Sequence, residues 1–179
     1  MMCEKYKLTK DQLDRFALQS HQRAKAATLE GAFKAEIVPI AARLNEGPEL
    51  NELHTADEGI RLDATYEGIS GVKLLREGGF ITAASASQIC DGASGVMVVN
   101  EKGLKALGVK PLARIHHMTV IGGDPVIMLE APLPATHHAL KKAGMKIDHI
   151  DLFEVNEAFA AVTMAAMTGS SFLRIDSPM

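Results

Sequence analysis

Residues 150–160, with the sequence IDLFEVNEAFA, carry the sharpest local signal of the chain. Residues 150–155 form a mostly apolar run that predicts a buried strand. Residues 156–167 are small and apolar nearly all round, which predicts a helix buried on most sides. Asn156 stands at the junction, where parallel α/β sheets bind ligands. It is therefore either an ordinary helix N-cap or an amide that orients a water or a substrate oxygen.

The residues before this stretch show the same alternation of strand and helix. A strand is predicted over 113–121, a turn over 122–125, and a helix over 134–143, with Pro134 suited to the first helical position and Gly144 to the residue after the end. Together with residues 150–167 this pattern predicts βαβα units with right-handed crossovers, and so an α/β fold.

The clearest local signal in the first half is a helix over residues 10–30. Thr9 and Gln12 are spaced as a capping box, in which each side chain bonds the other's backbone N–H, and Gly31 suits the position after the helix. Side chains recur at helical spacing on one narrow face: Leu13, Phe16, Ala17, Ser20, Ala24 and Ala27.

Weaker signals fill the middle of the chain. We predict an edge strand over 36–40, because Pro39 cannot donate to a ladder, and an irregular connection over 45–63. The remaining predictions are a helix over 65–75, strands over 80–84 and 96–99, and a helix over 101–107 capped by Asn100.

Composition excludes several classes of protein. The 179 residues carry 47% hydrophobic and 23% charged side chains and a net charge of −3, which excludes wholesale disorder and argues against a nucleic-acid partner. No apolar run reaches the length of a membrane span, and no secretory signal is visible at the N-terminus. Two cysteines are too few for a disulfide scaffold. We therefore expect a cytoplasmic protein that is not secreted, with an organelle left open.

The histidines and cysteines of the sequence give little support to a metal site or to a nucleophilic cysteine. Neither His116–His117 nor His137–His138 has the spacing that metal ligands need on a strand or a helix, so we expect no metal site. Cys90 is either a nucleophile or a small packed residue, and the absence of an evident neighbouring base favours the packed interpretation.

Several motifs in one order carry a resemblance to a known family. VNEAFA at 155–160 resembles the Asn-Glu-Ala-Phe motif of thiolases, and SQICDGA at 87–93 looks like their small-residue segment. Further similar stretches are 8–39, 57–61, 123–125 and 132–136. The resemblance covers roughly residues 1–167.

The resemblance implies a partial thiolase-like layered fold, with a helix-rich loop domain and an incomplete mixed or parallel sheet. Residues 1–88 would form the loop domain on the coenzyme A (CoA) side. Residues 89–109 would be the last strand and helix of the N-terminal core domain, and 110–167 the first half of the C-terminal core domain. The tail 168–179 does not resemble the family.

The resemblance also implies a chemistry: transfer of an acyl group between acyl-CoA and CoA or acetyl-CoA, as a Claisen condensation or its thiolytic reverse. The CoA thioester would be substrate, with no separate cofactor, and the family forms dimers or tetramers. Asn156 would hold the water of an oxyanion hole. Glu157 would be its neighbour, and Ser87 would lie against the pantetheine arm of CoA.

Departures from the family limit what this chain is expected to do alone. The family's nucleophilic cysteine lies upstream of anything here, Cys90 stands where the family has Ser or Asn, and the Gly-His-Pro histidine and basic cysteine do not appear after Met167. We therefore expect an inactive chain with exposed sheet edges and a final helix that has lost much of its cover. The alternatives are a non-catalytic CoA-binding or subunit-interaction module and, with least support, an unrelated Asn-dependent hydrolase.

Overall fold

The computed structural model describes residues 1–43 and 47–168, which fall into two compact units. Unit 1 comprises Met1–Lys7, Ile89–Glu157 and the residues from Ala161 onward, and unit 2 comprises Leu8–Gln88 and Ala158–Ala160. The predicted tail 168–179 lies outside the described residues, apart from the backbone of Thr168. In the part of the chain that the structure describes, no helix combines the length and the apolar character needed to cross a membrane.

Unit 2 is built on helix α2 (Lys10–Leu29), whose predicted start is confirmed and whose end lies one residue before the predicted residue 30. The backbone N–H of Gln12 donates to Thr9 Oγ1 at 3.3 Å, and the backbone N–H of Thr9 donates to Gln12 Oε1 at 2.9 Å, which closes the capping box. Gly31 follows the helix with a φ of 73°, a left-handed conformation that glycine adopts without strain.

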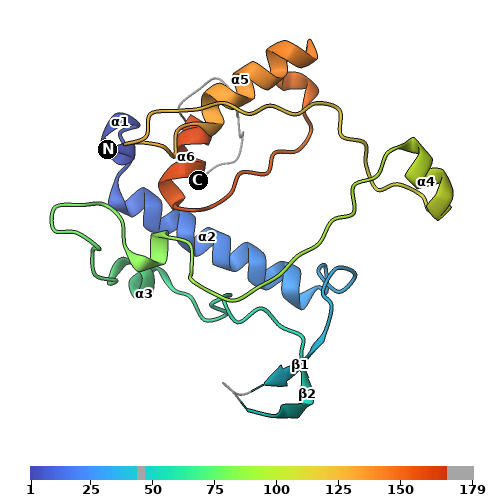
Figure 1. Cartoon of the computed structure of the whole chain (residues 1–179). Coiled ribbons are helices and arrows are strands. Elements are labelled where there is room, and N and C mark those ends of the chain that lie inside the picture. Colours follow the sequence, from blue (N-terminus) through green and yellow to red (C-terminus); the bar gives the residue numbers. More distant parts are fainter. Residues whose placement is uncertain (44–46, 169–179) are drawn as a thin grey trace. The chain divides into compact units, whose positions relative to one another are not determined.

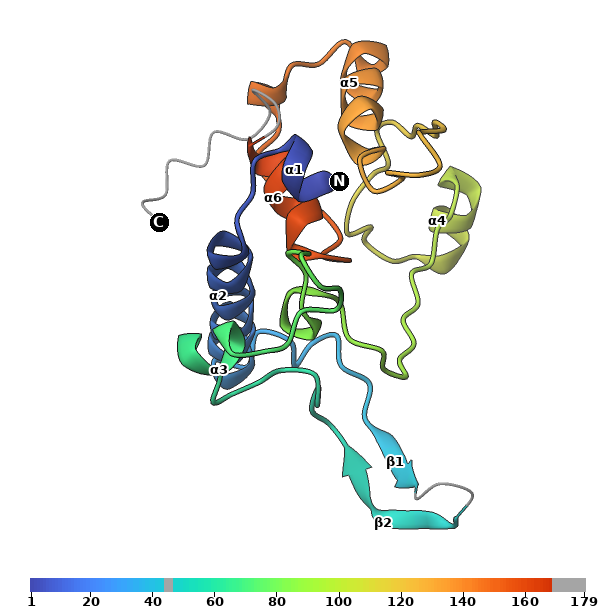
Figure 2. The same cartoon turned by 90° about the vertical axis from the view of Figure 1, so that its left-hand side faces the viewer.

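Helix α3 (Tyr66–Ser70) and the 3₁₀ turn η1 (Ala83–Ser85) pack against α2 (Figures 1 and 2). Leu13 and Ala17 are buried on the predicted face of α2. Helix α3 is shorter than the predicted 65–75, since Gly71 follows its last residue. The predicted strand 80–84 is wrong: the side-chain and backbone hydrogen bonds of Thr82 and Ser85 curl this segment into η1.

A small antiparallel hairpin completes unit 2. Strand β1 (Ile40–Arg43) pairs with β2 (Glu49–His54), with Ile40 opposite His54 and Arg43 opposite Glu49. Strand β1 begins at Ile40, the last residue of the predicted 36–40 strand, because Pro39 has no N–H to donate to the ladder. The predicted irregular connection 45–63 is wrong in part, since it contains β2; its first residues, 45 and 46, lie outside the described ranges.

Outside unit 2, helix α4 is confirmed with its predicted ends, and helix α5 differs from the prediction only at its start. Helix α4 (Glu101–Leu107) is capped by Asn100, whose Oδ1 accepts the N–H of Gly103 at 2.9 Å. Helix α5 spans Pro132–Ala143, two residues longer than predicted at its start, and Gly144 ends it with a φ of 64°. The remaining elements are α1 (Met2–Lys5), η2 (Ile147–His149) and α6 (Ala160–Thr168).

The predicted strands 96–99, 113–121 and 150–155 are wrong: within the described ranges none of them takes part in a β-ladder. A strand exists only through hydrogen bonds to a neighbour. Most apolar side chains of these segments are exposed, among them Val96, Val120 and Leu152. The expected loss of cover over the last helix is wrong, because α6 is buried along most of its length: Ala160, Ala161, Val162, Met164, Ala165 and Ala166.

Candidate functional site

The segment that carries Ser87 lies beside the start of α6 in unit 2. The backbone N–H of Ser87 donates to the carbonyl oxygen of Ala158 at 2.9 Å, and Ala86 forms an isolated antiparallel bridge with Phe159. The side chain of Ser87 is exposed. Two of the family-like stretches, 87–93 and 155–160, are therefore joined backbone to backbone.

Asn156 does not cap a helix, so the N-cap interpretation is wrong. Helix α6 begins four residues later, at Ala160. The bridge to Ala86 explains the delay, since it requires extended backbone at Phe159. The side chain of Asn156 is exposed, and within the described part of the chain it makes no hydrogen bond.

Glu157 is exposed as well, and it has a polar or electrostatic neighbour of its own. Asn156 and Glu157 belong to unit 1 and are connected to unit 2 by the peptide bond to Ala158. The structure therefore gives both predicted catalytic residues accessible side chains on an irregular stretch of backbone.

A polar clamp fastens loop 57–62 inside unit 2. Gln88 Nε2 donates to the carbonyl of Gly59 at 2.5 Å, and the N–H of Gly59 donates to Asp57 Oδ1 at 2.7 Å. The N–H of Arg61 donates to His21 Nδ1 on α2 at 3.2 Å. The clamp therefore ties the family-like stretches 8–39 and 57–61 to the residue that follows Ser87.

The support beneath Ser87 is a buried hydroxyl pair that our sequence analysis missed. Thr82 and Ser85 are 0% and 3% exposed. The N–H of Thr82 donates to Ser85 Oγ at 3.0 Å, and the N–H of Ser85 donates to the Thr82 carbonyl at 3.2 Å. These bonds satisfy the polar groups inside the turn and hold the chain direction just before Ser87. Threonine and serine three residues apart, as in a capping box, were the available signal.

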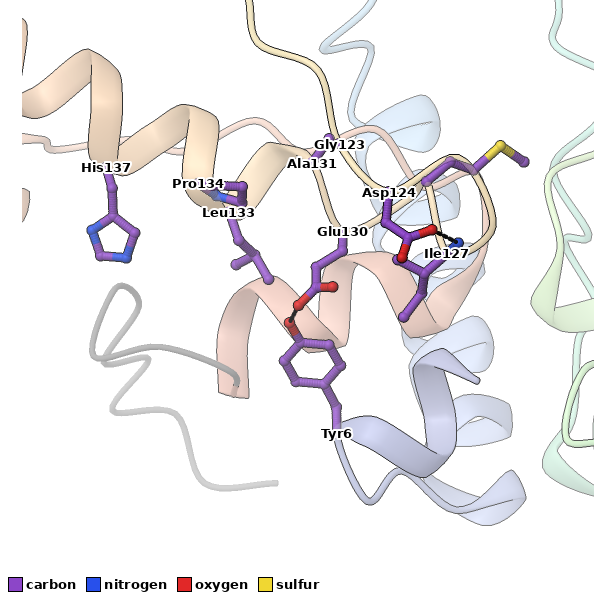
Figure 3. Close-up of a pocket in the computed structure, with 10 residues that line it drawn as sticks. Tyr6, Gly123, Asp124, Ile127, Glu130, Ala131, Leu133, Pro134 and His137 are labelled. Atoms are coloured by element: carbon purple, nitrogen blue, oxygen red, sulfur yellow. Dashed lines mark hydrogen bonds between the residues drawn. The ribbon is translucent and has the colours of Figure 1, made fainter.

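A separate cavity of about 410 Å³ lies in unit 1 and contains none of the predicted site residues (Figure 3). It is lined chiefly by the turn 123–128 and the start of α5, with Tyr6 opposite. The Tyr6 hydroxyl donates to Glu130 Oε1 at 2.5 Å, and Lys5 Nζ donates to Glu130 Oε2 at 2.7 Å. Sequence analysis missed this trio because more than 120 residues separate Glu130 from Lys5 and Tyr6.

The ionisation states of Tyr6 and Glu130 favour a structural role for this contact. Burial, followed by the hydrogen bond to Glu130, raises the pKa of Tyr6 to about 12. The hydrogen bonds from Lys5 and then Tyr6 lower the pKa of Glu130. At neutral pH the carboxylate is therefore ionised and the phenol neutral, an arrangement that stabilises the contact and leaves no proton poised for transfer.

The two cysteines differ in environment. Cys3 is 5% exposed, and burial is the main reason that its pKa lies above the ordinary value, so its thiolate is disfavoured. Cys90 is exposed on a stretch without regular structure, so the interpretation as a packed residue is wrong. Among the residues that the structure describes, no group of three His, Cys, Asp or Glu side chains could hold a metal ion.

Family models match most of this chain. The thiolase N-terminal domain matches residues 1–102, and the thiolase C-terminal domain matches residues 109–173. The chain belongs to the thiolase family, as the motifs indicated.

Curated relatives agree with this membership. The chain is 45% identical over 165 residues to a steroid 3-ketoacyl-CoA thiolase of Mycobacterium tuberculosis, an alignment that covers 92% of this chain and 39% of that protein. It is 43% identical over 166 residues to a 3-ketoacyl-CoA thiolase of Photobacterium profundum, covering 92% and 42%. The chain thus spans about two fifths of the length of these relatives.

Solved structures confirm the partial thiolase-like α/β fold. The Bacillus anthracis acetyl-CoA acetyltransferase superposes with a TM-score of 0.82 at 36% identity, covering 94% of this chain and 42% of that one. The human mitochondrial 3-ketoacyl-CoA thiolase in complex with CoA gives a TM-score of 0.80 at 36% identity, covering 94% and 41%.

Proposed function

We propose that this chain serves a thiolase-type acyl transfer, in which an acyl group passes between acyl-CoA and CoA or acetyl-CoA. CoA thioesters are the substrates, and no separate cofactor is needed. The observation that carries the proposal is the 40–45% identity to 3-ketoacyl-CoA thiolases over most of this chain. Dimers or tetramers and a cytoplasmic location complete the proposal; they rest on the resemblance and the composition.

Asn156 is the residue that we propose to act on the reacting thioester. When a thiolate attacks the thioester carbon, negative charge develops on the carbonyl oxygen, and a water held by the Asn156 amide would donate a hydrogen bond to it. One such donor is worth about 3–4 kcal/mol in the transition state. The exposed amide of Asn156 supports this role, and Glu157 is proposed as the neighbour that helps to orient the water.

The test is a chimera in which residues 1–167 replace the matched part of the Bacillus anthracis acetyl-CoA acetyltransferase. We expect an active chimera whose kcat for acetoacetyl-CoA thiolysis falls about 100- to 1,000-fold on Asn156→Ala, the cost of one oxyanion-hole donor. The matched control is Asn51→Ala, an exposed asparagine on β2. An inactive chimera, or equal rates for the two variants, would contradict the role of Asn156.

Ser87 is proposed to lie against the pantetheine arm of CoA, where a small side chain leaves room for the ligand. Its exposed side chain, the backbone bond to Ala158 and the clamp on loop 57–62 support this placement. A solved relative holds CoA.

Calorimetry with CoA tests the Ser87 proposal on the 179-residue chain. We expect weak binding, with a dissociation constant on the order of 1 mM, that is lost in Ser87→Trp because the indole fills the path of the ligand. Ser94→Trp, at another exposed serine, should bind as the parent does. Absence of heat at millimolar CoA from a chain shown to be folded would count against the site.

The second candidate is a non-catalytic CoA-binding or subunit-interaction module. The cysteines favour it, since Cys3 is buried and Cys90 stands where the family has Ser or Asn. A chain that binds CoA without turnover is compatible with both candidates. The chimera separates them, because a module needs no Asn156 chemistry.

A further inference from the structure

Two side chains of helix α2 hold neighbouring backbone groups of loop 57–62 in unit 2. His21 Nδ1 accepts the N–H of Arg61 at 3.2 Å, and Lys25 Nζ donates to the carbonyl oxygen of Leu62 at 2.6 Å. His21 and Lys25 are four residues apart, so they lie on the same face of the helix. Helix α2 therefore fixes the end of the loop through its backbone.

The hydrogen bond to His21 exists in only one protonation state of the imidazole. A backbone N–H can only donate, so the bond requires a lone pair on Nδ1, which the neutral ring supplies when its proton is on Nε2. A protonated imidazole carries N–H on both nitrogens and turns a donor toward the N–H of Arg61. Histidine is the side chain that gains its proton between about pH 8 and 5. The ring is half-buried beside an exposed loop, so solvent protons reach it.

The charges around His21 disfavour a closed loop once the ring is protonated. Lys25 lies one turn further along α2, and like charges at this spacing destabilise a helix. The charged side chains of the loop are Asp57, Glu58 and Arg61. Within the described residues none of them forms an ion pair with His21. Helix α3 bonds the first turn of α2, where the Tyr66 hydroxyl donates to Asp11, and η1 carries no titratable side chain.

We propose that loop 57–62 is a pH-sensitive latch, closed on α2 while His21 is neutral and released when His21 is protonated. An open loop withdraws the carbonyl of Gly59 from Gln88, the residue that follows Ser87. The effect on a CoA site at Ser87 rests on the proposed function. The latch itself does not, because it depends only on contacts within unit 2.

Exchange of amide protons with water, followed by NMR on the 179-residue chain between about pH 8 and 5, tests the latch. The protection factor of the Arg61 amide, which corrects for the intrinsic pH dependence of exchange, should fall about 5- to 10-fold, the worth of one hydrogen bond. Its midpoint should coincide with that of the His21 ring resonances in the same sample. The amide of Gly68, which donates to the Thr65 hydroxyl at 3.1 Å, should keep a constant protection factor.

Variants separate His21 from other titrating groups. His21→Asn puts an amide oxygen that takes up no proton in place of Nδ1, so the protection of Arg61 should become independent of pH. His21→Ala should lose this protection at every pH. His54→Asn, at an exposed histidine of β2, and Asp57→Asn, which keeps an acceptor oxygen, should respond to pH as the parent does. Circular dichroism checks that each variant keeps its helices, and His21→Asn decides if His21→Ala unfolds.

Two results would overturn the proposal. A protection factor at Arg61 that stays constant while the His21 ring titrates shows that the imidazole does not hold the loop. A fall of the same size and midpoint in His21→Asn assigns the response to another group.

Discussion

Tyr6 and Glu130 show what single residues contribute to unit 1. The Tyr6–Glu130 hydrogen bond (Figure 3) and the Lys5–Glu130 ion pair connect the N-terminal residues to the segment just before α5. A phenol whose pKa is raised in the folded state stabilises the fold fully below its ordinary pKa of 10, and this stability is lost as the pH rises toward about 12. Glu130 has the opposite sign, since its lowered pKa gives stability that is lost as the pH falls through it.

Alkaline titration checks this trio. In a Tyr66→Phe chain Tyr6 is the only tyrosine, because the sequence has two. We expect its absorbance midpoint near pH 12 and a lower midpoint after Glu130→Gln, with burial keeping it above 10. A midpoint near 10 before the second substitution would show that Tyr6 is neither buried nor bonded as described.

At the scale of the element, helices were predictable because their signals are local. The capping box of α2, the Asn100 cap of α4 and Gly144 after α5 each involve residues within one or two turns. The sequence could not establish whether segments 96–99, 113–121 and 150–155 form strands. Their sequences specify apolar faces, whereas the hydrogen bonds of a strand must come from a neighbouring strand. The start of α6 was misplaced for a related reason, since the Ala86–Phe159 bridge is a contact between distant residues.

The difference between local signals and contacts of distant residues applies to the candidate site as well. The motifs identified Asn156, Glu157 and Ser87, but the buried Thr82–Ser85 pair and the clamp from Gln88 to Gly59 emerge only from the fold. Each depends on packing or on a partner distant in sequence, which a linear motif does not encode. The roles of Asn156, Glu157 and Ser87 stay predictions.

Gly144 gives a test at this scale. A Cβ at Gly144 meets open space, so Gly144→Ala should lower the free energy of unfolding only through its φ of 64°, by about 1–2 kcal/mol. Gly122→Ala also meets open space but has no positive φ, so its effect should stay within about 0.5 kcal/mol. Urea denaturation followed by circular dichroism compares the two, and equal losses would remove the backbone explanation.

At the scale of the whole molecule, the chain combines membership of the thiolase family with partial coverage of its relatives. It belongs to the thiolase family and matches about two fifths of its relatives' length. Its two cysteines are a buried Cys3 and an exposed Cys90. The oxyanion role proposed for Asn156 requires a thiolate that attacks the thioester, so we expect these residues alone to bind a thioester without cleaving it.

The most direct measurement is the rate of acetoacetyl-CoA thiolysis by the purified 179-residue chain, beside a complete thiolase assayed under the same conditions. We predict no turnover above the uncatalysed background, since the thiol of Cys3 is buried and Cys90 stands at a position where the resemblance implies Ser or Asn. Turnover within a few orders of magnitude of the complete enzyme would contradict the account, because Cys3 or Cys90 would then be acting as the nucleophile.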